Sequence, residues 1–409
     1  MGDLGFSESY MYGEVSLPHT DLIPLFRLFL ANRPYLSTID GSSWVSTPQR
    51  VLNGIWARNT LTGSRKNISA HYDISNRMFE GFLSRDMTYS CALWDEVDGD
   101  LVGGGEEENV EGILRIGSTQ KPAQTFTQAA GKDEEDPLYE AQMNKLRYII
   151  SLLRIPTDTS EPIRVLEIGS GWGSLSILLA STYPHVHIDT LTLSTQQKSL
   201  ADERIRASGL SDRVKVHFMD YRQIPVEWKG KFHRVVSVEM VEAVGEAYLS
   251  TYFAQIDQAL HPTRGIGVVQ SITIPEARFK NYQKEVDFIQ KWIFPGGFLP
   301  SLTVLMNAME LGSAGRLTVD GVRNIGVHYA RTLREWRRRF LGRFEEVVRP
   351  ALEEERGVKG EEEVEVFKRK WIYWVFGESA WGSCVVFFEG RVWGYEEGAE
   401  VSVEIRDRV

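Results

Sequence analysis

The chain has 409 residues, of which 42% are hydrophobic and 25% are charged, as in ordinary globular proteins. A collagen-like repeat, a coiled-coil rod and a wholly disordered chain are therefore excluded, and the net charge of −10 gives no basic excess for binding nucleic acid. Two cysteines, Cys91 and Cys384, are too few for a disulfide scaffold or a multi-cysteine zinc site, so no metal is expected.

The first third of the sequence contains a poorly patterned N-terminal extension and, further along, an acidic insertion. Residues 1–66 show no clear pattern and form a poorly defined extension, whereas residues 67–409 are expected to form one large domain. No segment has the charge pattern of a signal peptide or the length of a membrane span, which predicts a cytoplasmic protein that associates with membranes only peripherally. Eight acids and three consecutive glycines within residues 95–111 predict that residues 97–137 are a solvated, disordered insertion.

Strands and helices then alternate. The expected elements are, in order, the strand Arg164–Ile168, the helix Ser174–Tyr183, the strand Val186–Leu193, the helix Thr195–Ala207, the strands Val214–Met219 and Arg234–Val238, the helix Tyr248–Leu260 and the strand Gly265–Ile272. Strands separated by helices of this length are typical of βαβ units with right-handed crossovers. The fold class is therefore α/β, with a doubly wound, mostly parallel sheet.

The alternation stops after Pro275. Residues 276–315 look helical, a strand is expected near Leu317–Val327, and an arginine-rich helix over Thr332–Val347. The acids of Glu353–Glu365 predict a second solvated loop, and Cys384–Glu389 predicts a last strand with the cysteine as inert core. We therefore expect a helical cap over residues 276–380, inserted before the last strands.

A glycine-rich loop, Glu167–Gly173, lies between the first strand and the first helix of the sheet. Glycines allow the tight turn and the close approach of a cofactor to the backbone. A dinucleotide site would place an acid at the end of the second strand, where this chain has Leu191-Thr192-Leu193-Ser194. The loop therefore favours S-adenosylmethionine over NAD or FAD.

Several longer stretches resemble the cyclopropane-fatty-acyl-phospholipid synthase family, which includes the mycolic acid cyclopropane synthases, and most resemble its eukaryotic, fungal-type members. They include HYDISN, MTYSCA, IGSGWGSL, VEMVEAVG, FPGG and HYARTL, and the similarity covers roughly residues 65–376 apart from the acidic insertion. The resemblance implies the class I S-adenosylmethionine methyltransferase fold. It also implies transfer of a methylene unit to the cis double bond of a phospholipid acyl chain, giving a cyclopropane fatty acid.

The resemblance also implies roles for individual residues. The contacts to S-adenosylmethionine would be Tyr89, Ser90, Gly169, Gly171, Gly173, Thr192, Gln197, Asp220 and Tyr221. A bicarbonate ion would act as the base, held by Glu242, Cys91 and Tyr329, with Gln270 where the bacterial enzymes have histidine; His71 and His328 are alternative bases. Acyl-chain walls would come from Phe294, Phe298, Trp371, Tyr373 and Trp374, of which at least half are expected to be core.

Alternatives to this function stay open. A methyl-branching enzyme or another lipid methyltransferase would share the motifs, and Gln270 together with Gly377, which replaces a family cysteine, favours a catalytically impaired lipid- or cofactor-binding homologue. Six arginines, namely Arg331, Arg334, Arg337, Arg338, Arg339 and Arg343, either attract phospholipid head groups or pair with Glu345, Glu346 and the acidic loops. The expected partners are acyl chains at a membrane surface, and a homodimer stays open.

Overall fold

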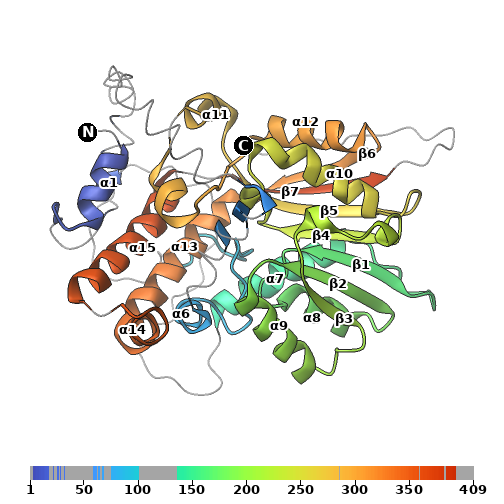
Figure 1. The fold of residues 1–409 in the computed structure, drawn as a ribbon, viewed down its shortest axis with the longest axis horizontal. Coiled ribbons are helices and arrows are strands. Elements are labelled where there is room, and N and C mark those ends of the chain that lie inside the picture. The colour runs from blue at the N-terminus through green and yellow to red at the C-terminus, as the bar shows by residue number, and fades with distance from the viewer. Residues whose placement is uncertain are drawn as a thin grey trace.

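The computed structural model describes residues 3–17, 75–100, 136–284, 286–358, 360–381 and 384–392, together with a few scattered residues between 22 and 68. Its centre is a seven-stranded sheet of order β3-β2-β1-β4-β5-β7-β6 (Figure 1). The strands are β1 (Ile163–Ile168), β2 (Val186–Thr192), β3 (Val214–Phe218), β4 (Arg234–Val238), β5 (Ile266–Thr273), β6 (Leu317–Asn324) and β7 (Cys384–Val392). The first five strands pair in parallel, and β7 runs antiparallel to both β5 and β6. The predicted α/β fold class is confirmed.

Helices cover both faces of the sheet because alternate strand residues point to opposite sides. Val165 packs in one core with the helices α7 (Pro137–Leu152), α8 (Ser174–Thr182) and α9 (Thr195–Ala207). Its neighbour Leu166 packs in a second core with α10 (Leu249–Ala259) and α12 (Leu302–Ser313). Helix α7 begins where the Asp136 carboxylate accepts hydrogen bonds from the amides of Leu138 and Tyr139.

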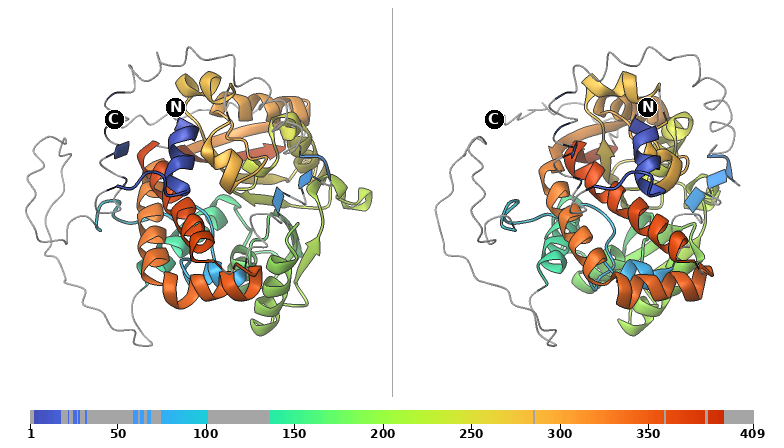
Figure 2. Two further views of the ribbon diagram at one scale, coloured as in Figure 1. Left: turned by 60° about the vertical axis from the view of Figure 1, so that its left-hand side comes forward. Right: turned by 90° about the vertical axis from the view of Figure 1, so that its left-hand side faces the viewer.

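A layer of helices lies beside the sheet (Figure 2). It contains α13 (Gly326–Gly342), the π-helix η7 (Phe344–Val348), α14 (Arg349–Arg356) and α15 (Glu361–Trp381), joined by α1 (Asp3–Met11) and α6 (Asn76–Glu80). Helix α11 (Glu276–Tyr282) and the π-helix η6 (Ile289–Ile293) link this layer to the sheet. Short 3₁₀ turns follow the strands β3 and β4, namely η2 (Tyr221–Gln223), η3 (Val226–Trp228), η4 (Val241–Ala243) and η5 (Glu246–Tyr248). None of these described helices has the length and apolar character needed to cross a membrane.

Two expectations for the C-terminal third need correction. The acidic stretch Glu353–Glu365 is not a loop, because it belongs largely to α14 and α15. Three glutamates, 361 to 363, occupy the first turn of α15, where the helix dipole favours negative charge, and Arg349 pairs with Glu353 at 3.0 Å. The arginine-rich helix begins six residues earlier than expected, at Gly326, and ends at Gly342.

The remaining predictions on domain organisation stay predictions. The expected cap over residues 276–380 contains β6 as well as helices. Of the expected insertion, residues 101–135 lie outside the described part of the chain, as do the Cys384 side chain and His71.

Candidate active site

The candidate site lies at the carboxyl edge of the parallel strands. The strand order reverses between β1 and β4, and ligands of open α/β sheets bind outside the strand ends at such a reversal. Gly169 follows β1, Glu239 follows β4, and Thr192 ends β2. The fold therefore brings three distant segments of the chain to one edge.

The glycine loop after β1 has a left-handed backbone at Gly169, Gly171 and Gly173, with φ of 98°, 48° and 88°. A Cβ at Gly171 would meet no other atom of the described chain, so its side faces open space. A Cβ at Gly173 would lie 3.4 Å from that of Ala201, so this glycine lets α8 and α9 pack closely. The loop thus combines one glycine open to a ligand with one that serves packing.

A cavity opens over this loop. Of the expected cofactor contacts, it is lined by Tyr89, Ser90, Gly169, Gly171, Thr192, Gln197 and Tyr221. Gly173 and Asp220 do not line it, and the Asp220 carboxylate instead forms an ion pair with Arg222 at 2.6 Å. The Tyr221 hydroxyl is buried without a partner in the described chain. The open side of Gly171 would let an adenosyl cofactor approach the loop closely. The unpaired Tyr221 hydroxyl would form a hydrogen bond with that cofactor.

Three charged residues to which the sequence assigned no role also line this cavity, namely Lys145, Glu167 and Glu239. The Lys145 ammonium of α7 is fully buried and donates to Ser90 Oγ at 2.6 Å. Burial lowers the pKa of Lys145 to about 8, although the negative charge of Glu239 opposes the shift. Burial likewise raises the pKa of Glu167 to about 7, against the hydrogen bonds from Ser176 and Thr190. Lys145 could have been found, because Gln142, Lys145 and Ile149 share the buried face of α7 by their helical spacing.

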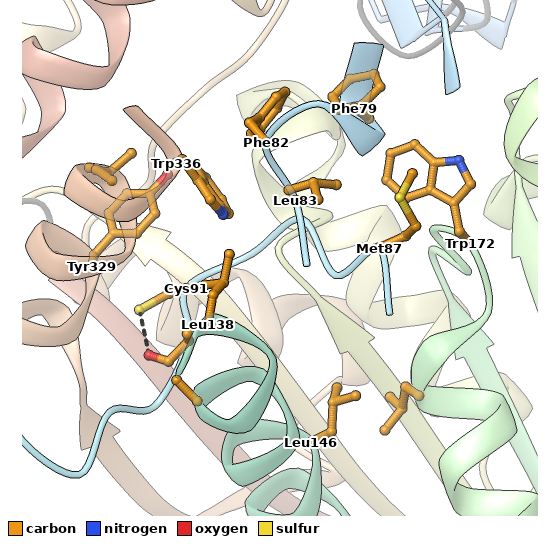
Figure 3. Close-up of a cluster of buried hydrophobic side chains, with 14 of the residues drawn as sticks. Phe79, Phe82, Leu83, Met87, Cys91, Leu138, Leu146, Trp172, Tyr329 and Trp336 are labelled. Carbon is orange, nitrogen blue, oxygen red and sulfur yellow. Dashed lines mark hydrogen bonds between the residues drawn. The ribbon is translucent and has the colours of Figure 1, made fainter. Parts of the chain in front are cut away.

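The MTYSCA segment, residues 87–92, lines this cavity through its first four residues. It runs between Trp172 of the glycine loop and the rings of Tyr329 and Trp336 on α13 (Figure 3). Gln142 Nε2 donates to the carbonyl of Ser90 at 2.8 Å, which fixes the segment against α7. The Cys91 thiol is buried and donates weak hydrogen bonds to the carbonyls of Ala92 at 3.4 Å and Ile325 at 3.9 Å. Burial raises the pKa of Cys91 well above its usual range, so this thiol stays protonated.

A second, largely apolar cavity adjoins the first. Of the expected wall residues it is lined by Phe294, Phe298 and Trp374, joined by Tyr329 and Trp336. Trp371 and Tyr373 do not line it: the Trp371 ring packs on Phe340 at 6.2 Å and that of Tyr373 on Phe288 at 4.7 Å. Ile68, Tyr89, Glu239 and Ala243 line both cavities, so the two spaces meet beside Glu239.

The four residues expected at the anion site fall into two pairs by the groups that surround them. Glu242 and Tyr329 line the apolar cavity, whereas Cys91 and Gln270 line neither. Glu242 Oε1 accepts from Ser271 Oγ at 3.0 Å and from the Ile272 amide, and Oε2 is buried without a partner in the described chain. Burial, and then the charge of Glu239, raise the pKa of Glu242 to about 8.

Cys91 and Gln270 donate hydrogen bonds to a different carboxylate, that of Glu239. The Cys91 amide donates to Glu239 Oε1 at 2.9 Å, and Gln270 Nε2 donates to the same oxygen at 2.7 Å. Two of the donors expected for the anion are therefore bound to the Glu239 carboxylate, and the anion-holding role of Cys91 stays a prediction. His328, an alternative base, lines neither cavity, and its Nδ1 accepts from the Trp94 amide at 3.1 Å.

The arginines of α13 are engaged largely in ion pairs. Arg334 pairs with Asp100 at 2.7 Å, and Arg339 pairs with both Asp136 at 2.5 Å and Glu335 at 2.7 Å. These contacts favour the pairing alternative over head-group attraction. The partners are Asp100, Asp136 and Glu335, whereas Glu345, an expected partner, pairs with Arg349 and Lys368.

The sheet order, the glycine loop and the cavity at the carboxyl edge define a class I S-adenosylmethionine-dependent methyltransferase. The model of the family "Mycolic acid cyclopropane synthetase" matches residues 59–107 and 117–358. The chain therefore belongs to this family of lipid-modifying methyltransferases.

Individual relatives agree with this assignment. The chain is 31% identical to tuberculostearic acid methyltransferase UfaA1 of Mycobacterium tuberculosis over 93% of this chain and 76% of that protein. It is 32% identical to the cyclopropane-fatty-acyl-phospholipid synthase of Escherichia coli over 68% of this chain, which spans 57% of that protein's length. Among solved structures, the mycolic acid cyclopropane synthase CmaA1 complexed with SAH and CTAB superposes with a TM-score of 0.59 at 22% identity, covering 80% of this chain and 97% of that one. Sphingolipid C9-methyltransferase of Candida albicans is also 32% identical, but over only 56% of this chain and 44% of that protein, so the expected fungal-type subclass is not confirmed.

Proposed function

We propose that the protein transfers a methylene unit from S-adenosylmethionine to the cis double bond of a phospholipid acyl chain and forms a cyclopropane fatty acid. The observation that carries this proposal is the meeting of two cavities of different character beside Tyr89 and Glu239. One lies over the glycine loop of a methyltransferase fold, and the other has aromatic walls suited to a hydrocarbon chain. An acyl double bond in the second cavity would face a methyl group held in the first.

The proposed roles follow the positions of the side chains. Tyr89, Ser90, Gly169, Gly171, Thr192, Gln197 and Tyr221 would bind S-adenosylmethionine, which supplies a methyl group activated on a sulfonium ion. Gly173 and Asp220 would act indirectly, through helix packing and through the turn at η2. The rings of Trp336, Trp374 and Phe294 would exclude water and stabilise the carbocation that follows methyl transfer. Tyr329 and Glu242 would contact the reacting part of the chain from the same cavity.

A methyl-branching activity is the second candidate, favoured by the name of the relative that matches 93% of the chain. Both reactions begin with the same methyl transfer. They differ in which carbon then loses a proton, and a saturated methyl branch additionally needs a reductant. Aromatic walls alone do not distinguish the two outcomes.

The bicarbonate base implied by the resemblance fits this chain poorly. Two of its four expected holders, Cys91 and Gln270, already donate to Glu239. We therefore derive no step through bicarbonate. Contact with a membrane surface and formation of a homodimer remain proposals, and vesicle co-sedimentation and the mass in solution test them.

The test of the function starts with cofactor binding. Gly171→Asp places a carboxylate in the cofactor cavity and should abolish binding of S-adenosylmethionine in calorimetry. Gly209→Asp is the matched control, since Gly209 also has a left-handed backbone with open space at its Cβ but lies outside both cavities. Expression in a host that lacks cyclopropane fatty acids should then add one CH₂ unit to its unsaturated acyl chains, and NMR of the product distinguishes a ring from a branch. A wild-type protein that binds the cofactor yet modifies no acyl lipid would contradict the proposal.

A further inference from the structure

Glu239 has an unusual backbone and an unusual position. It directly follows β4 and has a φ of 47°, in the left-handed region that residues other than glycine rarely adopt. Its amide donates to the carbonyl of Gln270, the residue paired with Val238 in the next strand. This arrangement directs the side chain to the place where the cofactor and acyl cavities meet. Backbone strain of this kind persists only where the surrounding structure imposes it.

The contacts of Glu239 are those that an anion-binding site would supply. The Cys91 amide and the Gln270 side chain both donate to Oε1, at 2.9 and 2.7 Å. The buried Lys145 ammonium lies on the same cavity, and its positive charge favours the ionised form of Glu239. Burial acts in the opposite direction and raises the pKa of Glu239, which makes it a better proton acceptor than an exposed carboxylate.

We propose that the Glu239 carboxylate is itself the base of this enzyme and occupies the place of the bound bicarbonate that the resemblance implies. The inference rests on the proposed function, since it names the base for the same reaction. With Oε1 held by two donors, Oε2 is the oxygen that accepts the proton.

The reaction balances without a further reactant. The acyl double bond supplies the electron pair of the new carbon–carbon bond, and the pair of the broken carbon–sulfur bond stays on sulfur. A carbocation remains on the chain beside the new methyl group. Glu239 then removes one proton from that methyl group, and the released C–H electron pair closes the three-membered ring. Removal of the proton from a neighbouring chain carbon would instead give an unsaturated branched product.

Two variants test this role in different ways. Glu239→Gln keeps the shape and an acceptor for both donors but cannot take up a proton. Glu239→Gly suits the left-handed backbone and frees the donors of Cys91 and Gln270 for an external anion. Glu203→Gln, an exposed carboxylate of α9, is the control. All three should bind S-adenosylmethionine like the wild type.

Turnover is measured on vesicles of a cis-unsaturated phospholipid, in carbonate-depleted buffer and with added bicarbonate. We expect the wild type and Glu203→Gln to be equally active in both buffers. Glu239→Gln and Glu239→Gly should lose about 10²–10⁴-fold in carbonate-depleted buffer, and bicarbonate should restore activity to Glu239→Gly alone. Wild-type turnover that requires bicarbonate, or a Glu239→Gln variant at the wild-type rate, overturns the proposal.

A binding measurement separates this inference from the proposed function. NMR of ¹³C-bicarbonate with protein saturated with S-adenosylhomocysteine should show no bound ion on the wild type and a bound ion on Glu239→Gly. A bound ion on the wild type overturns the inference whether or not any lipid is modified. If no acyl lipid is modified although this pattern of binding is found, the proposed substrate is wrong and the assignment of the anion site to Glu239 still holds.

Discussion

Glu242→Gln should stabilise the protein at neutral and alkaline pH but not at acidic pH. In the folded protein the pKa of Glu242 is raised from 4.5 to about 8, mainly by burial and to a smaller extent by the charge of Glu239. The folded state therefore holds this proton more tightly than the unfolded state, and stability is lost as pH rises from 4.5 to about 8. Glutamine imitates the protonated form at every pH, and its oxygen can accept the hydrogen bonds from Ser271 and Ile272.

The magnitude follows from the pKa shift. Each pH unit between the two pKa values costs about 1.4 kcal/mol. At pH 7 the wild type has lost about 3 kcal/mol relative to pH 4, and above pH 8 about 5 kcal/mol. The free energy of unfolding of Glu242→Gln should exceed that of the wild type by a difference that grows over this window.

The assay is urea unfolding followed by tryptophan fluorescence at pH 5, 7 and 8.5. Glu203→Gln is the control, because its exposed carboxylate should leave the pH dependence of the wild type unchanged. A difference between Glu242→Gln and the wild type that is constant from pH 5 to pH 8.5 would refute the argument. So would a glutamine variant that is less stable than the wild type at pH 8.5.

Two further predictions concern the cavities. Tyr221→Phe should leave the stability of the cofactor-free protein unchanged, because the Tyr221 hydroxyl has no partner in the described chain. The variant should weaken S-adenosylmethionine binding about 3- to 10-fold in calorimetry. Equal affinities of the variant and the wild type would show that the hydroxyl does not contact the cofactor. Trp374→Ala and Trp371→Ala should each lower the free energy of unfolding by about 3–5 kcal/mol, since both rings are buried. Only Trp374→Ala should also weaken binding of a spin-labelled acyl chain, because Trp374, unlike Trp371, lines the apolar cavity. Equal effects of the two variants on acyl-chain binding would contradict the assignment of Trp374 to the cavity wall.

The parallel sheet was predictable because its signals are local. Runs such as Arg164–Ile168 are rich in aliphatic residues and are followed by a turn and a helix, and the observed β1 begins only one residue earlier. The glycine loop was predictable for the same reason. The acids 361–363 misled the prediction, because a cluster of negative charge occurs both in solvated loops and in the first turn of a helix. The packing of α15 on α13 and α1, which are distant in sequence, distinguishes the two.

The position of Glu239 was not predictable from local sequence. It lies three residues before Glu242, and the sequence offers two carboxylates of similar surroundings. What distinguishes them is the pairing of β4 with β5, which places Gln270 beside Glu239, and a left-handed backbone that no local pattern specifies. The contact to the Cys91 amide joins segments 148 residues apart. The choice between the two carboxylates therefore depended on tertiary structure.

The ion pairs of α13 anchor both ends of the segment that connects Asp100 to Asp136. Asp100 is held by Arg334 and Asp136 by Arg339, five residues apart on one helix and so separated by a rise of about 8 Å. Both ends of the segment are thus held against the same helix. The family match is interrupted at residues 108–116, within this segment. We therefore expect a change of length in this segment, or an affinity tag introduced there, to leave the carboxylates and rings that line the two cavities in place.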